Sequence, residues 1–400
     1  MTRSEFMSRR LSDLGIIGAS LFLMNLGFST YSAVYNNFLV NDLHIRPDQL
    51  GILESLREVP GFLVVGMAAV AVQFRESRVA AFALLLMGVG LAGFAQCTTL
   101  WELIAAASVM SVGFHLFMPL NSSLILAASE EGQQGRRSGQ MGSVGAGGAL
   151  AGMALVLAVV GLLGRRYTFV PAGIAVVLGG LLLYLLRDKQ TVARSRVVFR
   201  RRYGVFYALT LLDGSRRQIF GTFAVFALIR LYHLDVTHIT WILVLNTLVS
   251  IITVPMIGRL IDRVGERRVL AVNYAFLVFL FAGYALVTQL WLLVILYCVD
   301  NAFFGFSMAI NTYLKKIAPP QEVSPSLVMG TTVNHIAAVG VPLIGGALWA
   351  SYGYQITFLA GAATCLFSVA AALAIRLPAA AALGGLTVGA GEAGSLAISE

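Results

Sequence analysis

Residues 79–97 read VAAFALLLMGVGLAGFAQC, nineteen consecutive positions without a charged side chain. A helix that crosses a bilayer needs about 20 mainly apolar residues. Runs of this kind recur along the chain with polar breaks between them, whereas the strict alternation expected of membrane β-strands is absent. The sequence is 58% hydrophobic and 12% charged, whereas soluble domains carry about 25% charged residues. The sequence therefore predicts an all-α polytopic membrane protein.

The apolar runs predict twelve transmembrane helices. We expect them at residues 13–38, 49–72, 79–97, 100–126, 139–163, 168–186, 204–230, 238–261, 268–288, 290–314, 327–351 and 355–376. The most basic stretch, RDKQTVARSRVVFRRRY at 187–203, lies midway along the chain. The expected organisation is a six-helix bundle over 1–186, a basic cytoplasmic linker over 187–203, a second six-helix bundle over 204–376, and a flexible, Ala/Gly-rich cytoplasmic tail over 377–400.

The distribution of Lys and Arg predicts the orientation in the membrane. With the N-terminus inside, 21 of the 28 basic residues fall in cytoplasmic segments, 4 on the opposite side and 3 within spans. Cytoplasmic loops carry such an excess, so both termini are expected in the cytoplasm and the protein in the cell's inner (plasma) membrane. Contacts of these loops with anionic lipid head groups account for the net charge of +9. A nucleic-acid partner is therefore not expected.

The two halves of the sequence repeat each other at a nearly constant offset. MPLNSSL at 118–124 lies over MAINTYL at 308–314 at an offset of 190, which also superimposes Trp101 on Trp291. An offset of 189 superimposes His44 on His233. Matched Trp, Asn and His residues are much rarer by chance than matched aliphatic residues. The sequence therefore predicts two parallel, pseudo-symmetric repeats related by an axis along the membrane normal.

Twelve spans, a basic central loop and a half-length repeat resemble the major facilitator superfamily. Residues 258–268, GRLIDRVGERR, are similar to its G-x-L-x-D-R-x-G-R-[RK] loop, with Glu266 where a basic residue is usual. The resemblance covers about residues 10–376 and implies two six-helix bundles, with spans three, six, nine and twelve at the periphery. It also implies that Asp262 acts as a conformational latch against residues 324–327. The implied gate consists of Gly258, Asp262, Arg263, Gly265 and Arg267.

Three charged residues lie within about one turn of the second predicted span. Glu54 and Arg57 are spaced to pair, while Glu54 and Glu58 repel each other. A charged residue inside the membrane is costly unless it is paired or hydrated, so each is a candidate functional residue. Two carboxylates that compete for Arg57 make one of them a candidate proton carrier. The alternative is a salt bridge that closes the cavity on the outer side or holds helices together.

The seventh predicted span contains LLDGSRRQIFG at 211–221, in which Asp213 lies three and four residues before Arg216 and Arg217. One carboxylate cannot neutralise two guanidinium groups. The second arginine therefore needs a partner on another helix, water or an anionic substrate, which a planar guanidinium binds well. Asp300 in span ten is the expected interhelical partner and the first candidate for proton coupling. A purely structural bridge between Asp300 and one of these arginines is the alternative.

Other polar residues within the spans give weaker signals. A lone histidine inside a span is more often a hydrogen-bonded packing residue than a proton relay. This is the first interpretation of His115 in span four and His335 in span eleven, and a functional role, for His335 in substrate binding, is the alternative. The remaining candidates for the substrate cavity are Tyr31, Tyr35, Asn36 and Asn334. The cysteines Cys97, Cys298 and Cys365 are too far apart to indicate a disulfide framework or a zinc site. No metal cluster, cofactor motif or catalytic set is visible, so neither a cofactor nor an enzyme is expected.

These features together predict a secondary active transporter that works by alternating access and is driven by protons, as a symporter or an antiporter. The excess arginine on span seven favours a small organic anion or zwitterion as substrate. The alternative is proton-driven export of amphipathic drug-like compounds, although span five lacks the Gly-Pro pair typical of drug/proton antiporters of this superfamily. A transport-dead membrane sensor or scaffold is a third possibility. The protein is expected to be a monomer surrounded by membrane lipids.

The orientation can be tested by labelling introduced cysteines with a membrane-impermeant reagent. Cysteines that replace Asp48 and Arg166 should react from outside, because these positions lie on the side that holds 4 of the basic residues, against 21 on the other side. Cysteines that replace Ser195 and Gly265 should react only from the cytoplasm. The reverse pattern would overturn the assigned orientation.

Overall fold

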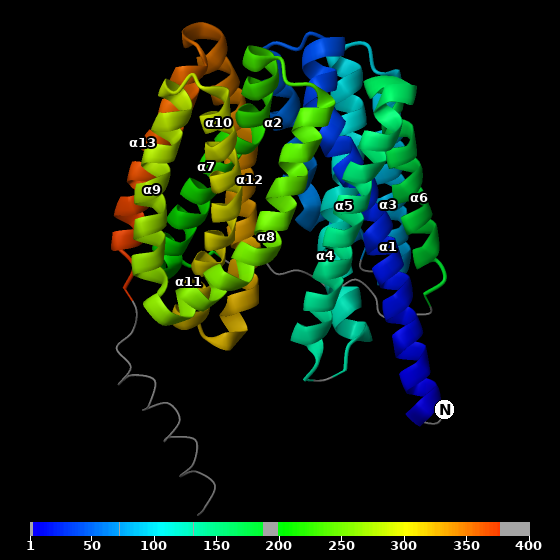
Figure 1. The fold of residues 1–400 in the computed structure, drawn as a ribbon. Coiled ribbons are helices and arrows are strands. Elements are labelled where there is room, and N and C mark those ends of the chain that lie inside the picture. The colour runs from blue at the N-terminus through cyan, green and yellow to red at the C-terminus, as the bar shows by residue number, and fades with distance from the viewer. Residues whose placement is uncertain (1–2, 72, 131, 187–198, 377–400) are drawn as a thin grey trace, which may run out of the picture.

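The computed structural model describes residues 3–71, 73–130, 132–186 and 199–376 and is built of helices (Figure 1). The first half contains α1 (Arg3–Asn37), α2 (Pro47–Ala71), α3 (Glu76–Gly93), α4 (Leu100–Ala128), α5 (Gln134–Tyr167) and α6 (Phe169–Leu183). The second half contains α7 (Gly204–Tyr232), α8 (Val236–Val264), α9 (Glu266–Leu286), α10 (Leu290–Phe303), α11 (Met308–Ile317), α12 (Pro320–Tyr352) and α13 (Tyr354–Leu373). Residues 187–198 of the expected linker and the whole expected tail lie outside the described residues.

The predicted all-α membrane fold is confirmed. Within the described ranges, nine helices or helix pairs are long and apolar enough to cross a membrane, and α6 is a shorter apolar helix. The long helices α2 and α7 are not among the nine, because each contains the cluster of charged residues noted in the sequence. These two helices therefore carry the charge that lipid cannot solvate.

One predicted span is divided in the structure. The expected helix over 290–314 consists of α10, a 3-10 turn over Phe304–Ser307, and α11. A short 3-10 segment within a helix often marks a hinge or a strained sequence. Here it follows Asp300 within one turn, so the change in helix geometry lies next to a buried carboxylate.

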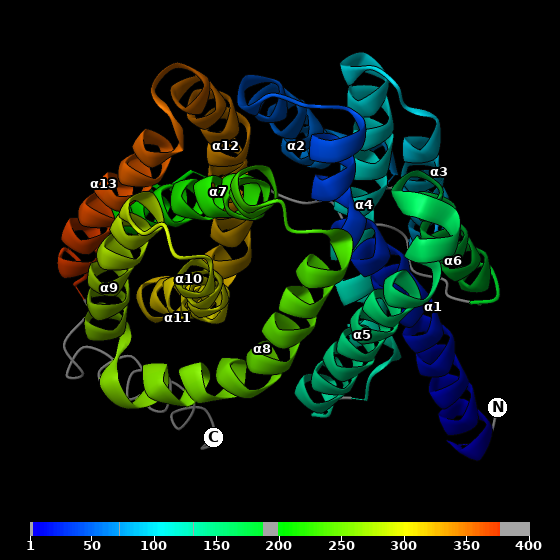
Figure 2. The same cartoon turned by 45° about the horizontal axis from the view of Figure 1, so that its top comes forward.

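The helices pack as two bundles, and apolar helices form the outer edge of each. In the first bundle α1 packs against α5 and α6, and α3 packs against α4 and α6. In the second bundle α7 packs against α12 and α13, and α9 packs against α13. Figure 2 shows α3 and α6 at one edge of the molecule and α9 and α13 at the opposite edge. These are the four helices that the family resemblance places at the periphery.

The two bundles meet mainly where α2 packs against α12 and α5 packs against α8. Near the start of α2 this approach depends on glycine, since a Cβ on Gly51 would lie 2.4 Å from the Pro342 carbonyl oxygen. A Cβ on Gly346 would lie 2.5 Å from the Pro47 carbonyl oxygen. The Arg230 side chain also donates a hydrogen bond to the Ile45 carbonyl at 3.1 Å. The halves are thus in direct backbone contact at the end drawn at the top of Figure 1.

Candidate functional site

A cavity of about 380 Å³ lies between the two bundles and has a mixed polar and aromatic lining. Residues of α1, α2, α7, α8, α10 and α12 contribute to its wall. Seven of the residues singled out from the sequence line this cavity: Tyr31, Tyr35, Asn36, Glu54, Arg57, Arg217 and Asn334. Tertiary packing therefore brings together, at one place between the halves, polar side chains that are far apart in the sequence.

The wall formed by the first half contains a compact charged network. The Tyr35 hydroxyl donates a hydrogen bond to Glu54 Oε1 at 2.7 Å. Arg57 Nη2 lies 2.6 Å from Glu54 Oε2 and 3.2 Å from Glu58 Oε1. Arg57 is thus shared between two carboxylates, as the helical spacing predicts, and its charge is compensated inside its own helix.

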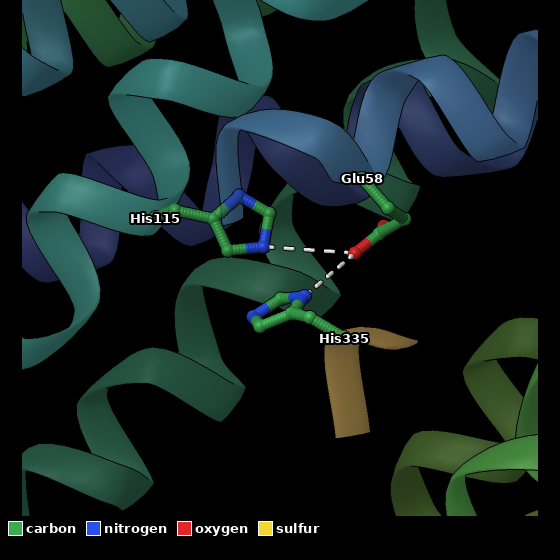
Figure 3. Close-up of side chains that lie close together, drawn as sticks. All are labelled: Glu58, His115 and His335. Atoms are coloured by element: carbon green, nitrogen blue, oxygen red, sulfur yellow. Dashed lines mark ion pairs between the residues drawn. The ribbon is translucent and has the colours of Figure 1, made fainter. Parts of the chain in front are cut away.

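The second oxygen of Glu58 faces two histidines (Figure 3). Glu58 Oε2 lies 3.7 Å from His115 Nε2 and 3.6 Å from His335 Nδ1, and the two imidazole rings are 5.0 Å apart between centroids. Glu58 and His115 belong to α2 and α4 of the first half, whereas His335 belongs to α12 of the second. The sequence does not predict that these three residues meet, because they belong to three helices that are far apart in the chain.

A second charged network lies entirely inside the second half. Arg216 Nε donates to Asp213 Oδ1 at 3.1 Å, and Arg216 Nη1 lies 3.4 Å from Asp300 Oδ1. The Tyr274 hydroxyl donates to the same Asp213 oxygen at 3.3 Å. Arg216 and Asp300 are both 0% exposed. Arg216 is therefore placed within the bundle rather than in the cavity wall, and Asp213 and Asp300 compensate its charge.

The neighbouring Arg217 has the opposite environment. It is exposed in the cavity wall, and its guanidinium lies over the Phe304 ring at 4.9 Å from the centroid. Among the residues that the structure describes, no carboxylate lies within 4.0 Å of it. A stack on an aromatic ring holds a guanidinium in place but leaves its N–H donors free. Arg217 is thus the arginine of this pair that can bind a ligand in the cavity.

The residues of the expected gate lie at the junction of α8 and α9. Gly265 ends α8 with φ of 86°, a conformation that favours glycine. Asp262, Arg263 and Arg267 are exposed, and among the described residues no hydrogen bond or ion pair joins the Asp262 side chain to residues 324–327. Glu266, which departs from the family motif, is buried and pairs with Lys316 at 2.7 Å. This ion pair links α9 to α11 of the same half, which explains why an acidic residue occupies this position.

Several residues of the cavity wall were not singled out from the sequence. On α7 these are Gly214, Gln218, Gly221, Thr222 and Val225, which line the cavity together with Arg217. Their spacing of three and four residues places them on one face of a helix. That spacing becomes a usable signal once Arg217 is known to face the cavity, which the structure shows. Phe28, Tyr297 and Phe304 also line the cavity, but aromatic residues are too common in this sequence to stand out.

Two helical bundles with a polar cavity between them have the architecture of a membrane transporter. The family model of the Major Facilitator Superfamily matches the chain twice, at residues 17–206 and 205–389. The chain belongs to this superfamily. Membership of this superfamily indicates a multi-pass membrane transporter.

Solved structures with the same fold are transporters with low sequence identity to this chain. A crystal structure of a mutant of the nucleoside transporter NupG has a TM-score of 0.78 and 15% identity, with 91% of this chain and 99% of that chain covered. A bacterial homolog of the human lysosomal transporter Spinster, in an inward-facing and unoccupied conformation, has a TM-score of 0.76 and 13% identity, with 91% and 96% covered. A search of curated proteins found no match.

The adjacent arginines of α7 provide a matched pair for a test of stability. Arg216→Leu should lower the free energy of unfolding by about 3–5 kcal/mol, because it leaves two buried carboxylates without their cation. Arg217→Leu should change it by less than about 0.5 kcal/mol, because Arg217 is an exposed residue of the cavity wall. Thermal and denaturant unfolding of the purified protein in detergent measures both. Equal stability of the two variants would contradict the assigned roles.

Proposed function

We propose that this protein is a secondary active transporter that moves a small organic anion or zwitterion between the two sides of the membrane by alternating access. The observation that carries the proposal is Arg217, a guanidinium in the wall of the central cavity with no carboxylate partner among the described residues. A cation in such a place is costly in the absence of water or a ligand that compensates it. A carboxylate or phosphate of a substrate meets that need with two parallel hydrogen bonds.

The charges on the two walls favour a zwitterion or a monoanion over a substrate of higher negative charge. On the first-half wall, Arg57 is held by the two carboxylates Glu54 and Glu58, so these three groups together carry a net negative charge. On the second-half wall, Arg217 supplies a positive charge that no carboxylate of the described residues contacts. A substrate whose acidic group binds Arg217 and whose donor groups face Glu54 and Asn36 satisfies both walls. Its apolar part fits against Phe28 and Tyr297.

The backbone contact between α2 and α12 supports a gating role for these helices. In the proposed orientation, with both termini in the cytoplasm of a cell whose inner membrane holds the protein, this contact lies on the outer side. Separation of Gly51 from Pro342 and of Gly346 from Pro47 would open the cavity there. The Asp262 latch would then act at the cytoplasmic side when the α8–α9 junction approaches residues 324–327. Monomeric function among membrane lipids is part of this proposal.

Proton coupling is proposed to use Asp300. Its Oδ1 faces Arg216, while its Oδ2 is buried without a hydrogen-bond partner and is therefore the atom at which a proton would be held. The charged groups around it are Asp213, Arg216 and Arg217, all on α7. Because Arg216 and Arg217 lie over the same Phe304 ring, a shift of Arg216 on protonation of Asp300 would be felt at the substrate-binding arginine.

The second candidate function is the export of amphipathic drug-like compounds. It is favoured by the aromatic residues of the cavity wall, among them Phe28, Tyr31 and Phe304. Nucleosides, the solutes of the structurally similar transporter NupG, represent polar neutral solutes in a test. The third candidate function is a transport-dead sensor. A measurement of solute movement distinguishes it from the other two, because a sensor moves no solute.

Substrate binding tests the role of Arg217. A panel of organic anions, zwitterions, nucleosides and amphipathic cations is first screened by thermal shift, and hits are tested by counterflow in proteoliposomes. For an acidic hit, Arg217→Ala should cost about 1.5–3 kcal/mol of binding free energy, about 10- to 100-fold in affinity. Arg217→Lys should fall between, because it keeps the charge and loses the planar fork.

The matched control is Ser215→Ala, two residues away on α7 and outside the cavity lining, which should bind like the wild type. Wild-type affinity in Arg217→Ala would contradict the anion hypothesis. Binding of amphipathic cations alone would favour the drug-export function. Binding without counterflow would favour a sensor.

Coupling is tested by the effect of a pH gradient on accumulation in proteoliposomes. Asp300→Asn should abolish accumulation driven by the gradient and spare substrate exchange at equal pH, because the amide cannot take up and release the proton. Asp235→Asn, at an exposed position before α8, is the control and should accumulate substrate normally. Gradient-driven accumulation by Asp300→Asn at the wild-type rate would exclude this residue as the proton carrier.

A further inference from the structure

Three donor atoms from both halves of the molecule converge beside the cavity. Glu58 Oε2 lies 3.7 Å from His115 Nε2 and 3.6 Å from His335 Nδ1, and all three atoms lie within 4.8 Å of one another (Figure 3). These separations are longer than a direct hydrogen bond. A tetrahedral zinc ion with ligand bonds of about 2.0–2.2 Å separates its ligand atoms by roughly 3.4 Å. The triad therefore has nearly the spacing of a metal-binding site.

Hydrogen bonds around His115 leave its Nε2 free to bind a metal. The Ser111 hydroxyl donates its proton to the Arg57 carbonyl at 2.5 Å, so its oxygen is free to accept from His115 Nδ1 at 3.0 Å. The Ser111 carbonyl also accepts from His115 Nδ1, at 2.9 Å. Both contacts assign the ring proton to Nδ1 and the lone pair to Nε2, which faces Glu58. A histidine oriented in this way by a backbone carbonyl is typical of metal ligands.

His335 and Gly61 add two independent observations. The His335 residue is 8% exposed, and its Nδ1 faces Glu58 without a hydrogen-bond partner. A Cβ on Gly61 would lie 2.4 Å from His335 Cε1 and 2.5 Å from His115 Nε2. Glycine at this position, three residues after Glu58, leaves the space that lets both imidazoles reach the carboxylate. Glu58 and His115 are partly buried and His335 is buried, and the three side chains have room for one another only because this residue has no side chain.

We propose that Glu58, His115 and His335 form a binding site for one divalent transition-metal ion of the zinc class. Two imidazoles and one carboxylate are the protein ligands of many zinc sites that keep a fourth position open. Imidazole nitrogen is a preferred ligand of zinc, nickel and copper, whereas calcium and magnesium require several oxygen ligands. The charge of Arg57, which contacts the other oxygen of Glu58, is already balanced by Glu54 at 2.6 Å. Its repulsion of the metal ion is therefore small.

A metal ion at this site joins the two halves of the molecule. Two ligands belong to α2 and α4, and the third belongs to α12. The ion therefore binds the conformation in which these helices are close and stabilises it relative to one in which they separate. Zinc-class ions are thus inhibitors of any process that requires the halves to move apart at α2 and α12. This inference does not depend on which solute the protein moves.

Metal binding is tested on the purified, tag-free protein in detergent after treatment with a chelator. Zn²⁺ titration by calorimetry should give one ion per chain, and Co²⁺ should show the intense visible absorption of a four-coordinate site. His115→Gln and His335→Gln should each weaken Zn²⁺ binding by at least about tenfold, since even loss of a supporting contact to a ligand costs that much. Zn²⁺ should raise the unfolding temperature of the wild type and not of these variants.

The matched control is His238→Gln, which removes an exposed histidine whose side chain is hydrogen-bonded to its neighbour Asp235. It should bind Zn²⁺ like the wild type. Wild-type affinity in both His115→Gln and His335→Gln, or absence of any Zn²⁺ binding by the wild type, would overturn the proposal. An equal loss in His238→Gln would do the same, because it would indicate adventitious surface binding. None of these readouts involves transport, so their failure is separate from failure of the proposed function.

Discussion

The structure depends on the need to compensate charges where lipid cannot solvate them. Residues 54–58 of α2 and 213–217 of α7 carry the charged clusters that set these helices apart from the apolar spans. A charged side chain toward lipid would cost several kcal/mol, so both helices must turn these faces inward. Their opposition across a shared interior creates the central cavity. The apolar helices α3, α6, α9 and α13 are then left to cover the edges.

The two charged clusters satisfy this constraint in different ways. On α7, Arg216 is enclosed by Asp213 and Asp300 inside one bundle, and its contacts need not change when the bundles move. On α2, Glu58 reaches His335 of the other bundle, so its surroundings depend on how the halves are placed. The contacts of the first cluster therefore lie within one bundle, whereas those of the second depend on how the two halves are placed. Arg217 belongs to neither cluster and faces the cavity.

Glycine residues determine how closely the two bundles approach each other. At Gly51 and Gly346 the lack of a side chain lets the backbones of α2 and α12 touch, and at Gly61 it lets two imidazoles approach one carboxylate. All three positions lie along the α2–α12 contact between the bundles. Because the backbones touch at Gly51 and Gly346 without side chains between them, a small relative movement changes the contact there abruptly. An interface of this kind suits a protein whose two halves exchange between discrete arrangements.

Local features of the sequence are enough to predict the all-α membrane fold and the helices that carry charge. These follow from the length of apolar runs and from the i,i+3 and i,i+4 spacing of ionic pairs, so the Glu54–Arg57 and Asp213–Arg216 pairs were predictable. Which of Arg216 and Arg217 faces the cavity was not predictable in this way. Adjacent residues on a helix differ by about 100° in direction, and the sequence does not show which direction is covered. The meeting of His335 with Glu58 and His115 likewise emerges only in three dimensions, because it is fixed by how two bundles dock, and contacts between distant helices leave no periodic trace in the sequence.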